Sequence, residues 1–333
     1  MTDGEPRSPT LVVQTAFLGD VVLTTPLLSA LAARHGPVDV VTTPGAAALL
    51  HGHPAVGSVF SYDKHGADRG IRGFWRLARL LKRAKYERAY LPHRSWRSGA
   101  LAWVAGVPER IGFADGARPL YTRRVPRPTG GHEVERLLAL AGTADGVPPV
   151  SLALPEEERQ AAEAWLAAAA VAPGFVAVAP GSIWGTKRWP YYGELAARLS
   201  RPIVVVGGPD DRHLGEEIGA GRGHVHNAAG ALSLRASAAL IARAAVLVTN
   251  DSAPLHLATA VGTPIVAIFG PTVPAFGFGP RGPRDEVIER SGLACRPCSL
   301  HGPRVCPLGH RHLAHAVMVA QVLKAVAAVI EGR

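Results

Sequence analysis

An aspartate interrupts an apolar run near the start of the chain. Residues 16–25 read AFLGDVVLTT, and Asp20 follows Gly19 directly. A core strand would exclude this carboxylate, because burying an unpaired charge costs several kcal/mol or forces the group to neutralise. Either Gly19 makes a turn and Asp20 caps a helix over 21–34, which would stabilise the helix by about 1 kcal/mol, or Asp20 takes part in chemistry.

A second polar segment, PGSIWGTKRWP at 180–190, carries donors for anionic oxygens. Ser182, Thr186 and Lys187 supply hydroxyl and ammonium groups of the kind that bind phosphate. The segment does not satisfy the Walker spacing GxxxxGK[ST], and GxGxxG occurs nowhere in the chain. A solvated basic loop anchored by Trp189 is the alternative interpretation.

The most informative polar residues follow a third apolar run. A strand expected over 245–249 leads into Asp251 and Ser252, and a helix begins near Pro254. The unpaired N–H groups of that first helical turn favour a phosphate. His256 lies in the same turn and could donate to the same anion, or it could simply be packed.

A cysteine cluster with the spacing C-x₂-C-x₇-C lies near the end of the sequence. The cysteines and the histidines around them are Cys295, Cys298, Cys306, His301, His310 and His312. They could form a structural zinc site of the Cys₃His type. Ordinary reduced thiols are the alternative that we favour.

The elements that must position these residues alternate between short β-branched runs and stretches of helical period. This alternation is typical of βα units around a parallel sheet. The expected strands of the first half are 10–16, 38–43, 56–62, 87–91 and 109–113, and its helices include 71–85, 97–105 and 132–141. A second series of strands follows at 175–179, 202–207, 224–226, 245–249 and 264–269.

Two successive series predict an α/β fold with two Rossmann-like domains whose parallel sheets face a central cleft. The first domain is expected over 1–155, a connection over 156–172 and the second domain over 173–312. The remaining segment, 313–333, contains a helix that could fold back across the first domain. Because ligands bind at the carboxyl ends of parallel strands, the loops after the strands are the expected sites.

The composition adds a charge argument. Lys and Arg number 36 against 26 Asp and Glu, which favours a partner of negative charge, such as nucleic acid, an anionic membrane face or a phosphorylated substrate. No nucleic-acid module is recognisable. Prolines and glycines break up the uncharged stretches 164–186 and 252–280, so we expect no transmembrane helix. The few cysteines and the absence of a signal-peptide pattern predict a cytoplasmic location.

Together these segments resemble glycosyltransferase family 9, the ADP-heptose:lipopolysaccharide heptosyltransferases, which have the GT-B architecture. The resemblance is carried by the order of seven motifs along nearly the whole chain: GDVVLTTPLLSAL, LPHRSWRSGALA, RIGF, HEVER, APGSIWGTKRWP, GGPDDR and NDSAPLHLATAVGTPIVAIFGPT. It implies that a heptose is transferred with inversion from ADP-L-glycero-D-manno-heptose to the inner core of lipopolysaccharide. Other members of the GT-B fold, with another nucleotide-sugar donor or glycan acceptor, and a non-catalytic nucleotide-sugar-binding protein remain alternatives.

The resemblance also implies roles for individual residues. Asp20 would be the general base that deprotonates the acceptor hydroxyl, and Lys187 would neutralise charge on the leaving diphosphate. Asp251 would contact the donor sugar. The other implied donor contacts are Ser182, Thr186, Asp210, Ser252, Ala253, Leu255 and His256. Asp210 corresponds to a position that binds the ribose, although Asp211 could substitute, and Ala253 stands where the family often has glycine.

The implied acceptor contacts lie in the first half of the chain: Gly19, His93, Arg94 and Arg97. The segment 63–97 holds eleven Lys and Arg residues against three acids. This charge suits an acidic lipopolysaccharide core and peripheral contact with the inner membrane. No D-x-D occurs, so no metal or other cofactor is expected to be required.

Overall fold

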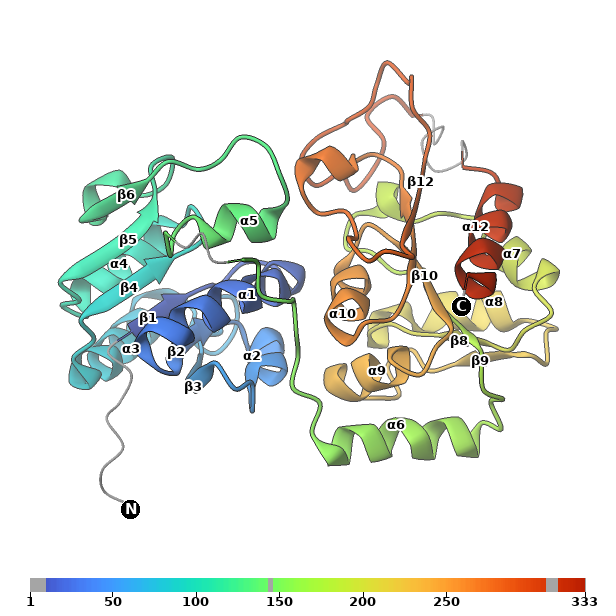
Figure 1. Cartoon of the computed structure of the whole chain (residues 1–333), viewed down its shortest axis with the longest axis horizontal. Helices are drawn as coiled ribbons and strands as arrows, with labels where there is room; N and C mark the ends of the chain where they lie inside the picture. The colour runs from blue at the N-terminus through green and yellow to red at the C-terminus, as the bar shows by residue number, and fades with distance from the viewer. Residues whose placement is uncertain (1–9, 143–145, 310–316, 333) are drawn as a thin grey trace. The chain divides into compact units, whose positions relative to one another are not determined.

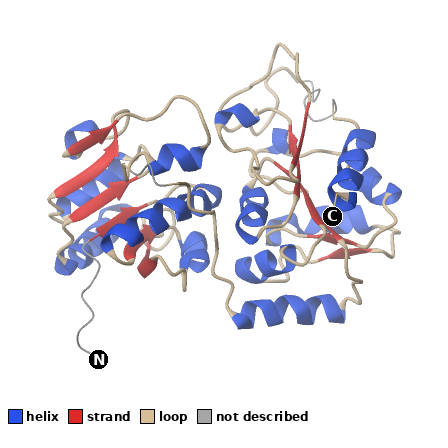
Figure 2. Cartoon of the chain, viewed as in Figure 1, coloured by secondary structure: helices blue, strands red, loops and turns tan. Residues whose placement is uncertain are grey.

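Six parallel strands form the sheet of each of the two units in this computed structural model (Figure 1). The structure describes residues 10–142, 146–309 and 317–332. The first unit is Met1–Ala153 and the second is Leu154–Arg333. In each unit, helices cover the sheet (Figure 2).

The sheet of the first unit has the strand order β3-β2-β1-β4-β5-β6. Its strands are β1 (Thr10–Val13), β2 (Val38–Thr42), β3 (Val56–Ser61), β4 (Arg88–Leu91), β5 (Glu109–Phe113) and β6 (Arg123–Val125). Its helices are α1 (Leu18–His35), α2 (Pro44–Leu50), α3 (Gly70–Ala84), α4 (Trp96–Val104), η1 (Arg118–Leu120) and α5 (Glu133–Leu138).

The sheet of the second unit repeats this order as β9-β8-β7-β10-β11-β12. Its strands are β7 (Val176–Ala179), β8 (Ile203–Val205), β9 (Val225–Asn227), β10 (Val246–Asn250), β11 (Ile265–Phe269) and β12 (Glu286–Glu289). Its helices are α6 (Glu156–Ala168), η2 (Gly185–Lys187), α7 (Tyr192–Arg198), η3 (Pro209–Asp211), α8 (Arg212–Gly219), α9 (Leu234–Ile241), α10 (Ala253–Val261), η4 (Pro274–Phe276) and α12 (Val319–Glu331).

The central strands are buried on both faces, which explains their nearly continuous apolar sequences. In β1, Leu11 and Val13 pack on one side with Leu77 of α3, while Val12 packs on the other side with Leu27 of α1 and with Leu137 of α5. Successive strand side chains point to opposite faces. One short strand therefore fastens helices on both faces of its sheet.

Each sheet has one place where the strand order reverses. The chain runs outward from β1 through β2 to β3 and returns to β4 on the other side of β1; β7 and β10 have the same relation. The loops that leave two such neighbouring strands run in opposite directions and open a space between them, where ligands of α/β sheets bind. The polar segments that the sequence analysis singled out follow β1, β4, β7 and β10.

The last helix belongs to the second unit. Val322, Val326 and Val329 of α12 are buried in the same core cluster as Val248 of β10 and Val266 of β11. The apolar face of α12 therefore packs on the second sheet, and the helix is part of the second unit. The connecting helix α6 likewise packs on α9 of the second unit (Figure 1).

Two edge strands, β6 and β12, were not predicted. Their sequences are RRV and EVIE, which lack the apolar runs of the central strands because an edge strand is only partly covered. No helix in the described ranges is at once long and apolar enough to cross a membrane.

Candidate functional site

Asp20 is the third residue of α1, and this position corrects the sequence prediction. The helix begins at Leu18 with Phe17 as the N-cap, so Asp20 does not cap a helix over 21–34 and Gly19 is helical rather than part of a turn. The helix can start early because a carboxylate in the third position reaches back to the free N–H groups of the first turn. Asp20 therefore lies, partly buried, at the end of the loop that follows β1.

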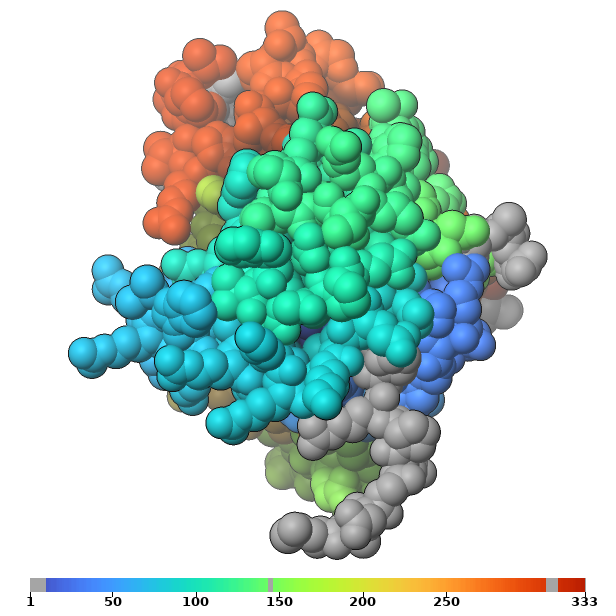
Figure 3. Space-filling view, turned by 90° about the vertical axis from the view of Figure 1, so that its left-hand side faces the viewer, coloured from blue at the N-terminus to red at the C-terminus, as the bar shows by residue number. Residues whose placement is uncertain are grey.

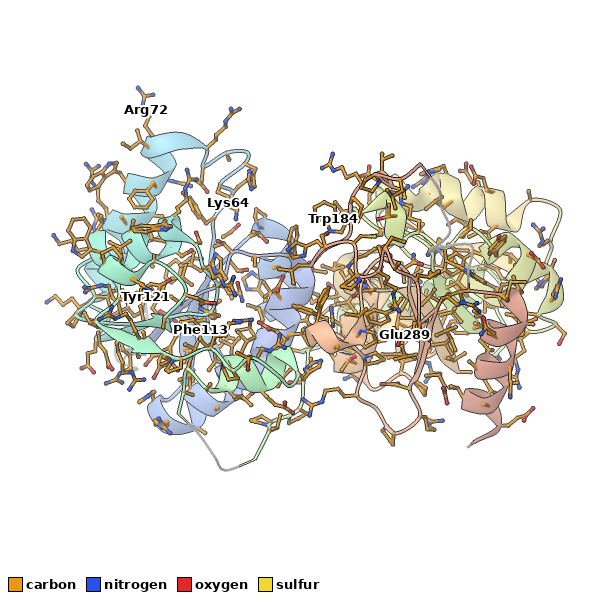
Figure 4. The ribbon with its side chains drawn as sticks, turned by 90° about the horizontal axis from the view of Figure 1, so that it is seen from above. Lys64, Arg72, Phe113, Tyr121, Trp184 and Glu289 are labelled. Atoms are coloured by element: carbon orange, nitrogen blue, oxygen red, sulfur yellow. The ribbon has the colours of Figure 1, made fainter. Side chains whose placement is uncertain are left out.

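The surroundings of Asp20 favour its protonated form. Burial, the largest cause, and the nearby carboxylate of Glu133 raise the pKa of Asp20 to about 6, against backbone hydrogen bonds at Phe17 and Asp20 and the charge of Arg127. Both Glu133 oxygens accept from Arg127 Nη2, at 2.8 and 2.6 Å. The Arg127 guanidinium also lies over the ring of Phe113, 4.7 Å from its centroid (Figure 4). A carboxyl with this pKa is ionised at neutral pH and basic enough to accept a proton.

The sequence analysis assigned no role to Glu133 or Arg127. Glu133 stands in the quoted motif HEVER, at the first turn of α5, and α5 packs on α1. The only hint in the sequence was that Arg127 and Glu133, of opposite charge, stand close together in a segment whose pattern predicts a loop followed by a short helix. Only the packing of the two helices brings these charges to Asp20.

His93 follows β4 and meets the loop that follows β1. Its Nε2 lies 3.4 Å from Thr15 Oγ1 and 3.3 Å from Ser98 Oγ. Burial, and then the ammonium of Lys64, lower the pKa of His93 to about 4, so that the imidazole is neutral at physiological pH. Lys64 Nζ donates to the carbonyl of Thr15 at 2.8 Å (Figure 4). The loops after three strands thus place a neutral imidazole, a lysine and two hydroxyls together.

The two predicted arginine contacts lie beside this cluster. Arg97, in the first turn of α4, donates to the Tyr62 hydroxyl at 3.4 Å. Arg94 is exposed and pairs with Asp115 at 2.7 Å. The charge of Arg97, after the effect of burial, lowers the pKa of Lys64. Arg97 and Lys64 are therefore close enough to interact through their charges, while Arg94 is paired with Asp115.

In the second unit, Asn250 ties together the loops after β7 and β10. Its side chain donates to the Pro180 carbonyl at 2.8 Å and accepts from the backbone N–H of Trp189 at 3.1 Å. The Tyr192 hydroxyl lies 3.3 Å from the same acceptor oxygen. Trp189 is buried, so it is the anchor of the basic loop that the sequence indicated.

The predicted residues Lys187 and Asp251 form a buried ion pair. Lys187 Nζ lies 2.6 Å from Asp251 Oδ2 and 3.1 Å from the Asp251 carbonyl, and each side chain is only 10% exposed. Thr272, three residues after β11, donates to the same carboxylate oxygen at 2.6 Å. The sequence analysis did not identify Thr272. The ammonium is therefore held at the edge of the sheet by two oxygens of one residue.

The N-terminus of α10 lies next to this pair. Ser252 is the N-cap, and its side chain makes no capping hydrogen bond. Ala253 is the first helical residue, whereas the N–H of Leu255 already donates to the Ser252 carbonyl at 3.1 Å. His256 is buried, with its ring edge-on to Phe278 at 6.4 Å. The structure brings these predicted donor contacts together with Lys187 and Asp251, although Leu255 offers no free N–H.

The remaining predicted donor contacts belong to the loops after β7 and β8. Ser182 Oγ accepts from the N–H of Trp184 at 3.2 Å. The hydroxyl of Thr186 donates to the carbonyl of Pro303, so this side chain is committed to a neighbouring segment. The ring of Trp184 stacks on His301 at 5.9 Å (Figure 4).

The two adjacent acids of the GGPDDR motif, Asp210 and Asp211, have different surroundings in the structure. Asp211 Oδ2 accepts from the N–H of Gly208 at 3.0 Å, and a Cβ on Gly181 would meet the Asp211 side chain at 2.2 Å. Asp211 therefore holds the turn together. Asp210 is exposed, and of the two it is the residue that is free to meet a ligand.

The cysteine cluster lies in the loop after β12. Cys298 Sγ is 3.2 Å from the Cys295 carbonyl, and burial and the neighbouring Cys295 and Cys306 thiols raise the pKa of the Cys298 thiol. Within the part of the chain that the structure describes, no group of three or more His, Cys, Asp and Glu side chains is arranged to hold a metal ion. His310 and His312, which belonged to the predicted set, lie outside the described residues.

Comparison with known proteins matches this chain to one family. The profile of glycosyltransferase family 9 (heptosyltransferase) matches residues 74–305. Lipopolysaccharide heptosyltransferase 2 of Escherichia coli K12 is 30% identical over 294 residues, which cover 80% of this chain and 84% of that protein.

Solved structures agree. The ADP-heptose lipopolysaccharide heptosyltransferase II of E. coli superposes with a TM-score of 0.79 at 25% identity, over 97% of this chain and 98% of the other. A family 9 glycosyl transferase from Veillonella parvula superposes with a TM-score of 0.86 at 24% identity, over 97% of both chains. The GT-B class of fold predicted from the sequence is confirmed.

The pKa of Asp20 makes a prediction about stability. Because the native pKa of about 6 lies above the ordinary value of 3.8, the native state holds its proton more tightly, and its stability falls as the pH rises from about 4 to about 6. The loss amounts to about 3 kcal/mol at most above pH 6. In Asp20→Asn this loss is absent. The midpoint of thermal unfolding of the variant minus that of the wild type should therefore be larger at pH 8 than at pH 4. Equal differences at both pH values would show that Asp20 titrates normally.

The buried ion pair makes a second prediction. Lys187→Met leaves the Asp251 carboxylate without its ammonium partner, which should lower the free energy of unfolding of the second unit by about 3 kcal/mol. Calorimetric scans would measure this as a lower midpoint. The double variant Lys187→Met/Asp251→Asn should recover most of the loss. If the single variant is as stable as wild type, the pair does not hold the loops together.

Proposed function

The chain belongs to glycosyltransferase family 9, and we propose that it transfers a heptose from ADP-L-glycero-D-manno-heptose to the inner core of lipopolysaccharide, with inversion at the anomeric carbon. What carries this proposal is coverage: the likeness to a lipopolysaccharide heptosyltransferase extends over four fifths of the chain. The motifs GDVVLTTPLLSAL and LPHRSWRSGALA lie at the strand-order reversal of the first sheet, and APGSIWGTKRWP and NDSAPLHLATAVGTPIVAIFGPT lie at that of the second.

In the proposed reaction, Asp20 is the general base. The acceptor hydroxyl attacks the anomeric carbon while the bond from that carbon to the diphosphate oxygen breaks on the opposite face. The hydroxyl proton passes to the Asp20 carboxylate, and the bonding electrons leave with ADP. A base positioned in this way contributes about 10²- to 10⁴-fold to the rate. The pKa of about 6 suits the task, since the carboxylate is ionised at neutral pH without being a very weak base.

The second unit would bind the donor. Lys187, already fixed at the sheet edge by Asp251, would neutralise the negative charge that the diphosphate gains as it leaves. The N–H groups of Ser252 and Ala253 at the start of α10 add the positive end of a helix dipole, with His256 in the same turn. Ser182 and Thr186 would be secondary contacts, Asp251 would contact the sugar and Asp210 the ribose. No metal or other cofactor enters this scheme.

The first unit would bind the acceptor at the carboxyl end of its sheet. His93, Arg94 and Arg97 were the predicted contacts, with Gly19 next to the base, and Lys64 joins them in the structure through Thr15. A cluster of cations suits an acidic sugar or a phosphate on the lipopolysaccharide core. The neutral His93 would act as a hydrogen-bonding group rather than as a charge.

We further propose that the enzyme is cytoplasmic and binds the inner membrane peripherally through α3. This helix contains no acidic residue and exposes Arg72, Arg79 and Lys82 next to Ile71 and Trp75. In the space-filling view α3, in light blue, projects long side chains from one edge of the first unit (Figure 3). Arg72 extends away from the ribbon (Figure 4). Cations beside exposed aromatic and apolar groups are the composition of helices that lie in a membrane interface.

The reaction is tested by ADP release from ADP-L-glycero-D-manno-heptose, with and without a heptose-deficient lipopolysaccharide. Release by the wild type should depend on the acceptor, and kcat/KM should rise with pH to a plateau above about pH 6 as Asp20 ionises. Asp20→Asn should lose at least about 100-fold in rate while keeping its affinity for ADP.

The controls decide between the alternatives. Hydrolysis without acceptor dependence would contradict transfer to lipopolysaccharide. If no heptose-deficient acceptor supports release but another nucleotide sugar does, the family assignment stands and the heptose donor is wrong. ADP binding without turnover of any nucleotide sugar would leave only a binding protein.

Membrane contact is tested with vesicles of phosphatidylcholine, with and without phosphatidylglycerol. The variant Arg72→Glu/Arg79→Glu changes the charge of α3 by four units, and at about 1 kcal/mol per charge it should lose most of its binding to the anionic vesicles. The matched control, Arg198→Glu/Arg243→Glu, makes the same change on the second unit. Equal losses in both variants would show that total charge, and not α3, attracts the membrane.

A further inference from the structure

The turn after β11 contacts the Asp251 carboxylate, which binds Lys187. Asp251 Oδ2 accepts from both Lys187 Nζ and the hydroxyl of Thr272, each at 2.6 Å. Two hydrogen bonds on one oxygen leave the carboxylate little freedom to rotate, so the position of Thr272 helps to set the direction of the ammonium. Thr272 lies in the turn that follows β11, and the question is what fixes that turn.

The answer is Arg296, whose side chain is only 6% exposed. Its Nε donates to the carbonyls of Gly270 and Thr272 at 2.8 and 3.1 Å, and its Nη2 donates to the carbonyl of Thr272 at 2.7 Å. Nη1 donates to the carbonyl of Arg290 at 3.0 Å, and Nη2 pairs with Glu289 at 2.5 Å. The rigid fork of a guanidinium is suited to bridging several oxygens at once, which an ammonium cannot do.

The segment around Arg296 also contacts the loop that carries Lys187. We call residues 293–306 the strap. The Pro303 carbonyl accepts from the backbone N–H and the hydroxyl of Thr186, and His301 stacks on Trp184. At Gly302 a Cβ would lie 2.9 Å from Pro271 and 3.3 Å from Thr186 Oγ1, so a larger residue would push the two loops apart. The strap therefore joins the loop before Lys187 to the turn that contains Thr272.

We propose that Arg296 is a positioning residue of the donor site, which holds Thr272 so that its hydroxyl keeps Asp251 aligned with Lys187. The role rests on the proposed function, because it concerns the group that would meet the diphosphate of the donor. Arg296 itself need not touch a ligand. It acts through three hydrogen bonds in sequence, from its guanidinium to the Thr272 carbonyl, from the Thr272 hydroxyl to Asp251, and from Lys187 to Asp251.

A double-mutant cycle distinguishes this role from simple stabilisation. Arg296→Lys keeps the positive charge but cannot bridge the carbonyls, and Thr272→Val removes the hydroxyl while keeping the shape. ADP affinity is measured by calorimetry on the full chain. Each single variant should weaken ADP binding by about 10-fold, and the double variant should bind no more weakly than Thr272→Val alone, because both changes act through one hydrogen bond.

Two control variants accompany the cycle. Thr272→Ser keeps the hydroxyl and should bind ADP as the wild type does. Arg290→Ala changes a strap-side arginine that contributes only its carbonyl to Arg296, and should also have no effect. Thermal unfolding identifies any variant that fails to fold. If Arg296→Lys does not fold, the cycle is repeated with Glu289→Gln, which weakens the hold on the guanidinium but leaves the arginine in place. Glu289→Gln should weaken ADP binding by less than Arg296→Lys would. This smaller loss of affinity should again be absent when Thr272→Val is also present.

The outcomes are distinct. Losses that multiply, to about 100-fold in the double variant, or an Arg296→Lys protein that binds ADP normally, would overturn the role of Arg296 and leave the proposed function intact. A wild-type protein that binds no ADP would overturn the proposed function and the role together.

Discussion

The reversal of strand order beside β1 and β7 is the constraint on which both sites depend. In a parallel sheet all strands end at the same edge, and where the order reverses the two neighbouring loops leave in opposite directions. This geometry brings Thr15 to His93 across 78 positions of the chain and Lys187 to Asp251 across 64. A change in the strand order would separate the members of each pair, whatever their sequence context.

The two units use opposite electrostatic arrangements at this common place in the fold. The first unit raises the pKa of Asp20 by burial and by a second carboxylate, Glu133, whose own charge is balanced by Arg127. The second unit instead fixes Lys187 with a carboxylate and sets it beside a helix N-terminus. A base needs a carboxylate that accepts a proton readily, whereas a leaving diphosphate needs fixed positive charge. In the proposed reaction, loops at the same place in the two sheets would therefore serve two different chemical needs because their neighbouring charges differ.

Local sequence patterns could predict the central strands and the residues that follow them. Asp20, Lys187 and Asp251 stand out because a charged group after an apolar run either ends the strand or has a function. Patterns could not predict the edge strands β6 and β12, which lack apolar runs. They also could not predict that Asp20 would enter the first turn of α1, since that depends on which group satisfies the free N–H groups. Thr272 was missed because its partner, Asp251, lies 21 positions away and follows a different strand.

The residues that interact with Asp20, and those that hold Lys187 through Asp251, come from distant parts of the sequence for the same physical reason. A loop at a sheet edge has few contacts of its own, so a charged side chain on it is held in one direction only if a different element supplies a second hydrogen bond. Glu133 and Arg127 come from the segment after β6, and Thr272 and Arg296 come from segments after β11 and β12. In both units, therefore, residues from later segments of the chain act on the charged groups at the centre of the sheet, Glu133 and Arg127 through their charges and Thr272 and Arg296 through hydrogen bonds. In the proposed reaction these later segments matter even though none of the four residues needs to touch a substrate, because a preorganised charge stabilises a transition state without first having to reorient.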